Sequence, residues 1–211
     1  MNSWAKYLLT LITSLVLKMD SLDNYKPTLW LIEKIDNAIL NLTPQFSISN
    51  RELMKFEKPR ITRAVDVARY GGPPLIPAYH PEFNLFFFPW KNFNSKYVND
   101  SVDYFSQAII HHEAGHYLHY SLNSKIPRNV LDLPYKFQKE HYALGELVAE
   151  YGNFILGINN KEHWKERWEF LERKGLTKTY LLYGRAFLPS LARMSLEEAI
   201  KTGILSELKF S

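Results

Sequence analysis

Apolar residues recur at helical spacing near the start of the chain. The range 27–42 carries one apolar stripe with spacings of three, three and four, formed by Leu29, Ile32, Ile35 and Ile39. This spacing predicts a helix, in which Pro27 occupies the first turn, where proline is tolerated. Further helices are expected over 4–17 and, as a short one, over 49–56.

The pattern changes between residues 61 and 89 to short runs of β-branched and aromatic residues. The run 61–70 ends at the Gly-Gly-Pro-Pro sequence of 71–74, a strong breaker of regular structure. Two later runs, 75–79 and 84–89, flank a short polar segment and therefore predict a β-hairpin. We expect its second strand over 84–88.

The second half of the chain returns to helical spacing. Helices are expected over the ranges 103–122, 135–158, 161–173 and 177–188. Ser195 and Glu198 form a capping box that predicts a last helix to about residue 208. Because helices surround one small group of strands, the expected fold class is α+β, a helix-dominated domain with a small mixed sheet.

The order of these elements suggests three segments. They are an N-terminal helical segment (1–60), a central core (61–158) and a C-terminal helical segment (159–211). One continuous domain is the alternative for a chain of 211 residues.

Composition narrows the class of protein. A hydrophobic content of 46% is typical of a globular chain and not of a disordered one. The absence of cysteine excludes a disulfide scaffold and thiolate metal sites, and it fits a reducing compartment such as the cytoplasm. The net charge is +4, but lysine and arginine are scattered, so no nucleic-acid partner is expected.

An apolar run at 7–17 lies between Lys6 and Lys18. It is too short to span a bilayer, which takes about 20 residues. No small-residue cleavage site of the kind that ends a signal peptide follows it. We interpret the run as a packed helix, with a membrane-surface anchor or an uncleaved export signal as alternatives.

The strongest chemical signal is the sequence His-Glu-Ala-Gly-His at 112–116. On a helix, His112 and His116 lie on one face, one turn apart, so both can bind a single ion. Zinc binds imidazole nitrogen, keeps a position open in catalytic sites and lowers the pKa of water there to about 7. Glu113 is placed to take that proton as a general base. We expect one zinc ion, with His112 and His116 as ligands and Glu113 as the catalytic residue.

A catalytic zinc ion needs a third protein ligand. A third histidine at metzincin spacing would fall at position 122, which is Leu122. Between residues 142 and 160 the only charged residues are Glu146 and Glu150, in a run otherwise suited to burial. Because buried carboxylates need partners, we assign Glu146 as the third ligand and Glu150 as the acceptor of a hydrogen bond from a ligand histidine. Exchanged roles and ordinary ion pairs with lysine or arginine are the alternatives.

Other polar residues have less specific signals. A donor that stabilises negative charge on the substrate oxygen is expected, and the candidates are Tyr180, Tyr183, Arg185 and His163. Core packing is the alternative for the tyrosines. His111 points about 100° away from His112 on a helix, which favours packing over metal binding. Glu140 and His141 have charged neighbours, which indicates a solvated face.

The motif at 112–116, followed by Glu146-Leu-Val-Ala-Glu150, resembles the gluzincin branch of the zincin metallopeptidases. That family pairs the motif with a downstream glutamate ligand, often followed four positions later by an acidic residue. The hairpin over 77–88 is similar to the family's edge strand, which lies along the active-site cleft and binds extended peptide by strand addition.

The resemblance covers residues 75–158, and two features depart from the family pattern. The distance from His116 to Glu146 is 30 positions (146 − 116), which is longer than in the thermolysin-like prototype. Glu150 also stands where aspartate is more usual.

The resemblance implies a zinc-dependent metallopeptidase that hydrolyses a peptide or protein substrate with water activated by Glu113. The alternative is a zincin-like regulatory or sensor module that acts on a single partner protein, with weak or latent peptidase activity. The helical flanks, 1–50 and from 161 onward, are large for a minimal core, so one of them is a candidate inhibitory segment.

Overall fold

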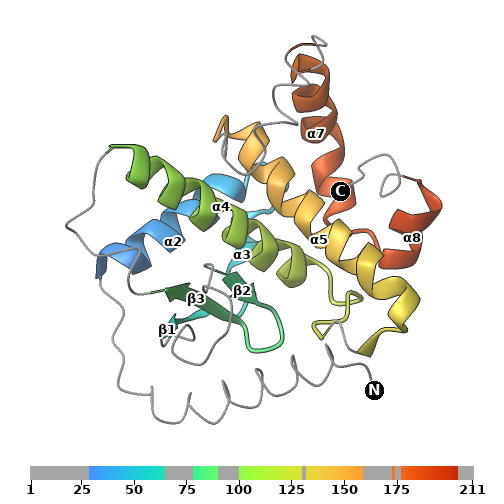
Figure 1. Ribbon diagram of the computed structural model, residues 1–211, viewed down its shortest axis with the longest axis horizontal. Helices are drawn as coiled ribbons and strands as arrows, with labels where there is room; N and C mark the ends of the chain where they lie inside the picture. Colours follow the sequence, from blue (N-terminus) through green and yellow to red (C-terminus); the bar gives the residue numbers. More distant parts are fainter. Residues whose placement is uncertain are drawn as a thin grey trace.

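The computed structural model of the chain describes residues 29–64, 78–89, 100–129, 132–158, 173 and 177–203. Its elements, in chain order, are α2 (Leu29–Leu42), α3 (Asn50–Leu53), β1 (Arg60–Ala64), β2 (Ala78–His80), β3 (Leu85–Pro89), α4 (Asp100–Leu122), α5 (Tyr135–Ile155), α7 (Thr177–Leu191) and α8 (Leu196–Lys201). Helices dominate, and the described strands form one small sheet, so the expected α+β class is confirmed (Figure 1). The helices expected over 4–17 and 161–173 lie outside the described residues.

The sheet is mixed, with the strand order β1-β3-β2. β1 runs parallel to β3, and β2 runs antiparallel to it, with Tyr79 opposite Phe86. The predicted hairpin is therefore confirmed, and β2 is an edge strand of the described sheet. Asn84 ends the turn with φ 47°, a backbone conformation that asparagine tolerates. Its side chain fixes the turn by accepting from the Tyr79 hydroxyl at 2.9 Å and donating to the carbonyl of Glu57 at 3.2 Å.

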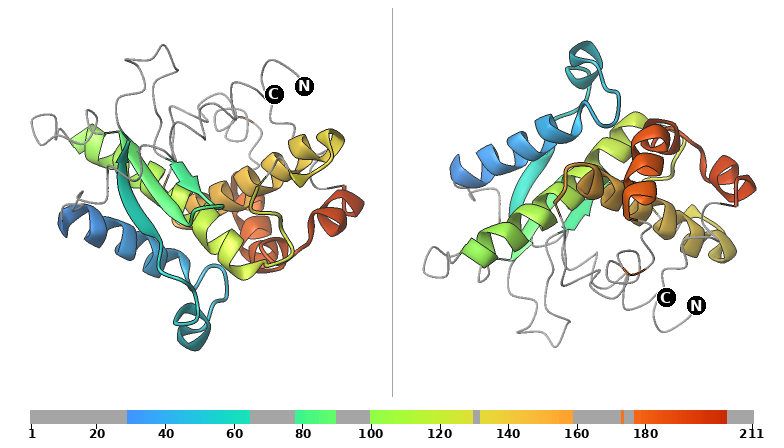
Figure 2. Two further views of the ribbon diagram at one scale, coloured as in Figure 1. Left: turned by 90° about the horizontal axis from the view of Figure 1, so that it is seen from below. Right: turned by 90° about the horizontal axis from the view of Figure 1, so that it is seen from above.

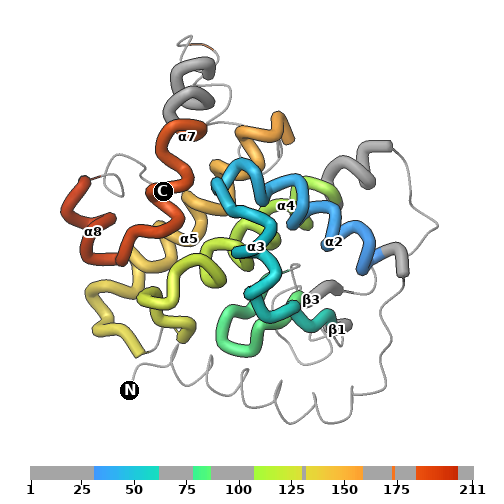
Figure 3. The backbone as a smooth tube through the Cα atoms, turned by 180° about the vertical axis from the view of Figure 1, so that it is seen from behind, coloured from blue at the N-terminus to red at the C-terminus, as the bar shows by residue number. Residues whose placement is uncertain are grey.

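Helices α4 and α5 cross at the centre of the molecule and carry the site described below. α2 packs against α4, α7 and α8 pack against α5, and the sheet contacts α4 through β2 (Figures 1 and 3). The buried face of α2 consists of Leu31, Ile35, Ala38, Ile39 and Leu42. Ile32, which was expected in this stripe, is only half-buried.

The crossing of α4 and α5 depends on a glycine. A Cβ atom at Gly115 would lie 2.8 Å from the Cα atom of Ala149, so the two backbones touch there. This approach is closer than side chains allow. It brings α5 across α4, as the two views in Figure 2 show. Glu146 and Glu150, one turn apart on α5, therefore reach the histidines of α4.

The start of α8 lies where the sequence predicts it, whereas α7 extends further than expected. Ser195 and Glu198 form the predicted capping box, because each side chain binds the backbone N–H of the other residue. α7 continues to Leu191 instead of ending before Pro189. Proline lacks an N–H, so Pro189 removes one hydrogen bond to the carbonyl four residues earlier, and α7 ends only two residues after it. No helix in the described part of the chain is long and apolar enough to cross a membrane.

Candidate metal site

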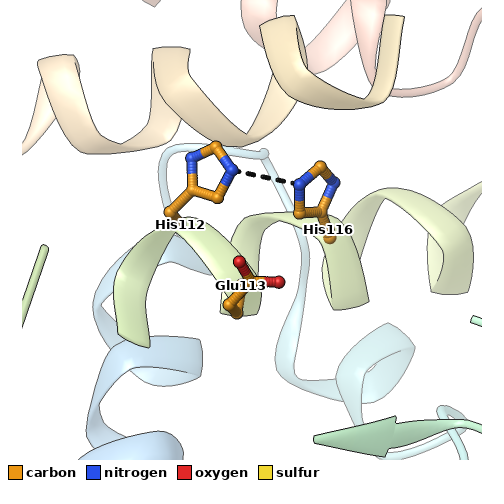
Figure 4. Close-up of side chains that lie close together, drawn as sticks. All are labelled: His112, Glu113 and His116. Atoms are coloured by element: carbon orange, nitrogen blue, oxygen red, sulfur yellow. Dashed lines mark hydrogen bonds between the residues drawn. The ribbon is translucent and has the colours of Figure 1, made fainter. Parts of the chain in front are cut away.

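Two imidazole rings face each other on α4. The Nε2 atoms of His112 and His116 lie 3.1 Å apart, and the ring planes meet at 84°. Both rings rise from α4 toward α5, as their spacing of one helical turn predicts (Figure 4). Their ring nitrogens therefore converge on one point between the two helices.

Glu146 approaches the same point from α5. One carboxylate oxygen lies 3.2 Å from Nε2 of His112, and the other lies 3.5 Å from Nε2 of His116. A tetrahedral zinc site with bonds of about 2.0–2.1 Å has ligand atoms about 3.3 Å apart. The three separations, two of which involve different oxygens of Glu146, lie near this value, so these side chains are spaced closely enough to hold one metal ion.

Glu150 lies behind His112. Its Oε2 atom is 3.0 Å from Nδ1 of His112, on the side of the ring away from His116. A carboxylate can only accept here, so Nδ1 carries a proton, and loss of the proton from Nε2 would leave a lone pair directed at the cluster. The two glutamates thus hold different positions, with Glu146 against both facing nitrogens and Glu150 against the far nitrogen of one ring.

Glu113 forms the third side of the cluster. Its carboxylate is buried and accepts a hydrogen bond from the backbone N–H of Tyr79 in the edge strand β2. Metal-binding atoms of His112, Glu113 and His116 all lie within 4.8 Å of one another, so this group can hold a metal ion. Burial raises the pKa of Glu113.

The electrostatics of the cluster couple its members. Burial by itself would lower the pKa of His112, but its hydrogen bonds to Glu146 and Glu150 outweigh burial and raise it well above the ordinary value. Burial would likewise raise the pKa of Glu146, and its hydrogen bonds to His112 and His116 lower it instead. A metal ion must displace the proton from His112, so metal affinity is expected to fall in acid.

Several other residues considered from the sequence lie away from the cluster or outside the described residues. His111 points to Asn41 and to the carbonyl of Gln107, which agrees with its expected packing role. Arg185 is exposed on α7. His163 and the side chains of Tyr180 and Tyr183 lie outside the described part of the chain.

The interpretation of residues 140–141 as a solvated face is wrong for His141. His141 is buried, and its Nε2 atom lies 3.1 Å from the hydroxyl of Tyr120 on α4. The error arose because charged neighbours in sequence point to other faces of α5, whereas His141 itself turns toward α4.

Sequence reasoning also missed two tyrosines near Glu146. Tyr120 lies one turn after His116 on α4, and Tyr142 lies one turn before Glu146 on α5. The negative charge of Glu146 contributes to the raised pKa of both hydroxyls. Helical spacing of four from a ligand was the signal that could have identified them.

Comparisons of the chain with models of protein families, with curated proteins and with solved structures found no match.

Proposed function

We propose that the chain is a zinc-dependent metallopeptidase of the gluzincin type, which hydrolyses a peptide bond in a peptide or protein substrate. One observation carries the proposal: His112, His116 and Glu146 converge from two helices, with the buried carboxylate of Glu113 beside them. A metal site with an adjacent buried base is the combination that hydrolysis requires.

His112, His116 and Glu146 would hold the ion. Two imidazoles and one carboxylate suit zinc, although other transition metals also accept this donor set. When bound, zinc supplies a Lewis acid that polarises a carbonyl group and acidifies water. Glu113 favours hydrolysis over the redox chemistry of iron sites with similar ligands, because it adds a base at the position where a water molecule would be activated.

Glu113 would move the proton. The N–H of Tyr79 occupies its Oε2 atom, which leaves Oε1 as the acceptor for a proton from the attacking water. Burial raises the pKa of this carboxyl, so it holds a proton more readily than an exposed glutamate and can then pass it to the leaving amine. Tyr79 would thus position the base through its backbone.

The edge strand β2 would align the substrate. Its partner β3 lies on one side, and the N–H of Tyr79 points away from β3 toward Glu113. The outer edge of β2 is therefore turned toward the metal-site residues. An extended peptide lying along this edge would pass its backbone close to Glu113, which already occupies the N–H of Tyr79 and leaves the Tyr79 carbonyl as the outward backbone group.

The test is a comparison of the wild-type protein with Glu113→Gln on a mixed peptide library, with cleavage products identified by mass spectrometry. We expect cleavage by the wild type, at least a 100-fold lower rate for the variant, and equal zinc content in both. Glu82→Gln is the control, because Glu82 is an exposed glutamate in the hairpin turn. Full activity in Glu113→Gln would contradict the mechanism.

A further inference from the structure

The metal-site residues are open to solvent beside one half of α5. The side chains of His112, His116 and Glu146 are 16%, 13% and 18% exposed, so a substrate can reach them. Every residue of α5 from Leu147 to Ile155 is buried. The exposed surface of α5 therefore continues from the site toward the N-terminus of the helix and not toward its C-terminus.

Three exposed side chains follow Glu146 in that direction. Tyr142, Lys139 and Tyr135 lie four, seven and eleven positions before it. At about 100° per residue, these three side chains and Glu146 fall within an arc of about 60° on the helix. Tyr135 and Tyr142 are 84% and 65% exposed, and they are the exposed large aromatic residues of the described part of the chain. Tyr135, Lys139 and Tyr142 thus form an aromatic–lysine stripe that ends at the metal site.

The stripe carries a positive charge that the described residues do not neutralise. The ion pairs of the described residues do not include Lys139. Glu140 follows Lys139 directly but points about 100° away on the helix, and Glu146 faces the histidines. Tyrosine is enriched in binding surfaces, and a cation selects a partner of opposite charge. The stripe is therefore complementary to a segment that carries an acidic side chain beside apolar ones.

We propose that the aromatic–lysine stripe binds the substrate and selects an aspartate or glutamate about three residues from the bond that is hydrolysed. This inference rests on the proposed function and names a substrate class for the same site. Lys139 lies about 10 Å from Glu146 along the helix axis, because a helix rises about 1.5 Å per residue. An extended peptide covers that distance in about three residues. The rings of Tyr135 and Tyr142 would contact the side chains next to the acidic one.

The charge of α5 favours a peptide over a membrane as the occupant of the stripe. Anionic membranes are bound by clusters of about four to eight basic residues. The basic residues of α5 are Lys136 and Lys139 alone. Since the stripe also continues directly from the metal-site residues, a substrate held at the site is the occupant that its position fits.

The test compares Lys139→Glu with Lys136→Glu in the full, zinc-loaded chain. Lys136 is a matched control, because it is an exposed lysine on the same helix but lies outside the arc of the stripe. Each protein is incubated with a library of natural peptide sequences, and the cleaved bonds are located by mass spectrometry.

A second measurement does not depend on cleavage. Two amidated peptides are made from the sequence cleaved most often, with aspartate or lysine at the third residue from the cleaved bond. Their dissociation constants are measured by fluorescence anisotropy with Glu113→Gln, which lacks the base, and with the same protein carrying Lys139→Glu or Lys136→Glu. Amidation removes the terminal carboxylate, so that the acidic side chain alone is compared.

We expect aspartate and glutamate to be enriched at this position in the wild type and in Lys136→Glu, and to be replaced by lysine and arginine in Lys139→Glu. The aspartate peptide should bind about fivefold more tightly than the lysine peptide, as an exposed ion pair allows. Lys139→Glu should reverse that order, and Lys136→Glu should keep it. Zinc content should be equal in all the proteins.

The outcomes separate failure of this inference from failure of the proposed function. If peptides are cleaved without an acidic preference, or with the same preference in Lys139→Glu, the inference fails and the peptidase proposal stands. If Lys139→Glu changes self-association or binding to phosphatidylserine vesicles and leaves peptide selection unchanged, the stripe has another occupant and the inference fails. If the zinc-loaded wild type cleaves no peptide of the library, the proposed function and this inference fail together.

Discussion

The Nδ1 atom of His112 lies 3.0 Å from Oε2 of Glu150, a carboxylate that is 3% exposed. The other oxygen of Glu150 has no hydrogen-bond partner among the described residues, so most of its interaction is directed at this one ring. A buried charge with a single partner is costly unless that partner is fixed in place. The pair therefore fixes the direction of the His112 ring before any ion binds, and it keeps the proton on Nδ1 when metal binding removes the proton from Nε2.

Substitution of each of the two glutamates of α5 should therefore weaken zinc binding to a different extent. Glu146→Ala should weaken zinc binding by more than about 100-fold, because it removes a ligand. Glu150→Ala should weaken it by about 10- to 100-fold, because it only frees the His112 ring. Competition with a fluorescent chelator measures both dissociation constants.

Glu140→Gln is the control for this series, since Glu140 is the remaining carboxylate of α5 and, among the described residues, the ion pairs of His112 and His116 are with Glu146 and Glu150 alone. A larger loss of zinc affinity in Glu150→Ala than in Glu146→Ala would show that Glu150 is the ligand and Glu146 the residue that orients the ring. Unchanged affinity in both variants would contradict the site.

The contact between Gly115 and Ala149 predicts that alanine at Gly115 lowers stability, whereas alanine at Gly145 does not. Gly115→Ala would place a Cβ atom 2.8 Å from backbone, so α4 and α5 must separate. We expect a loss of about 1–3 kcal/mol in the free energy of unfolding, despite a gain of about 1 kcal/mol in helix propensity. Gly145→Ala would meet the His116 ring at 3.6 Å, an ordinary contact, and should leave stability equal or higher. Urea denaturation of both variants is the measurement, and equal stabilities would contradict the close approach.

His119 predicts a specific acid sensitivity. It is buried, neither ring nitrogen has a partner among the described residues, and burial lowers its pKa to about 3. As pH falls below about 6.5, the unfolded chain takes up a proton at this residue and the folded protein does not, so stability falls by about 1.4 kcal/mol per pH unit. Above pH 6.5 this residue contributes no pH dependence.

His119→Leu should therefore flatten the stability profile between pH 6.5 and about 4, and it should be at least as stable as wild type at pH 7, because it removes a buried polar ring without breaking a bond. Thermal denaturation in the presence of a chelator, at each pH, keeps the metal ligands out of the comparison. Parallel stability profiles for the variant and the wild type would show that His119 does not cause the acid sensitivity.

The contacts of Arg193 predict that lysine at this position would lower the stability of the protein. Its guanidinium donates to the carbonyls of Phe46, Pro189 and Ser47 at 2.8, 3.2 and 3.3 Å, and so ties the turn after α2 to the end of α7. A single ammonium group cannot span three such acceptors. Arg193→Lys should cost about 1–2 kcal/mol in urea denaturation, whereas Arg51→Lys, at an exposed position on α3, should cost almost nothing. Equal losses of stability in the two variants would contradict this role of Arg193.

Local sequence was sufficient for several elements because their causes are local. The spacing of Ile35 and Ile39 predicts the buried face of α2, and the reciprocal side chains of Ser195 and Glu198 predict the start of α8. The hairpin of β2 and β3 follows from its short turn. In the candidate site, His112, Glu113 and His116 share a helix, so their spacing alone predicts that they meet.

Contacts between distant segments needed the tertiary structure. The separation of 30 positions between His116 and Glu146 does not say which α5 carboxylate faces the histidines. The direct backbone contact at Gly115 sets the rotation and height of α5, and this contact places Glu146 on both rings and Glu150 on one. The same packing turns His141 inward against Tyr120. Sequence thus determined which residues can bind a metal ion, and helix packing decided how they are arranged, because side-chain direction on one helix is periodic whereas the approach of two helices depends on the shape of both.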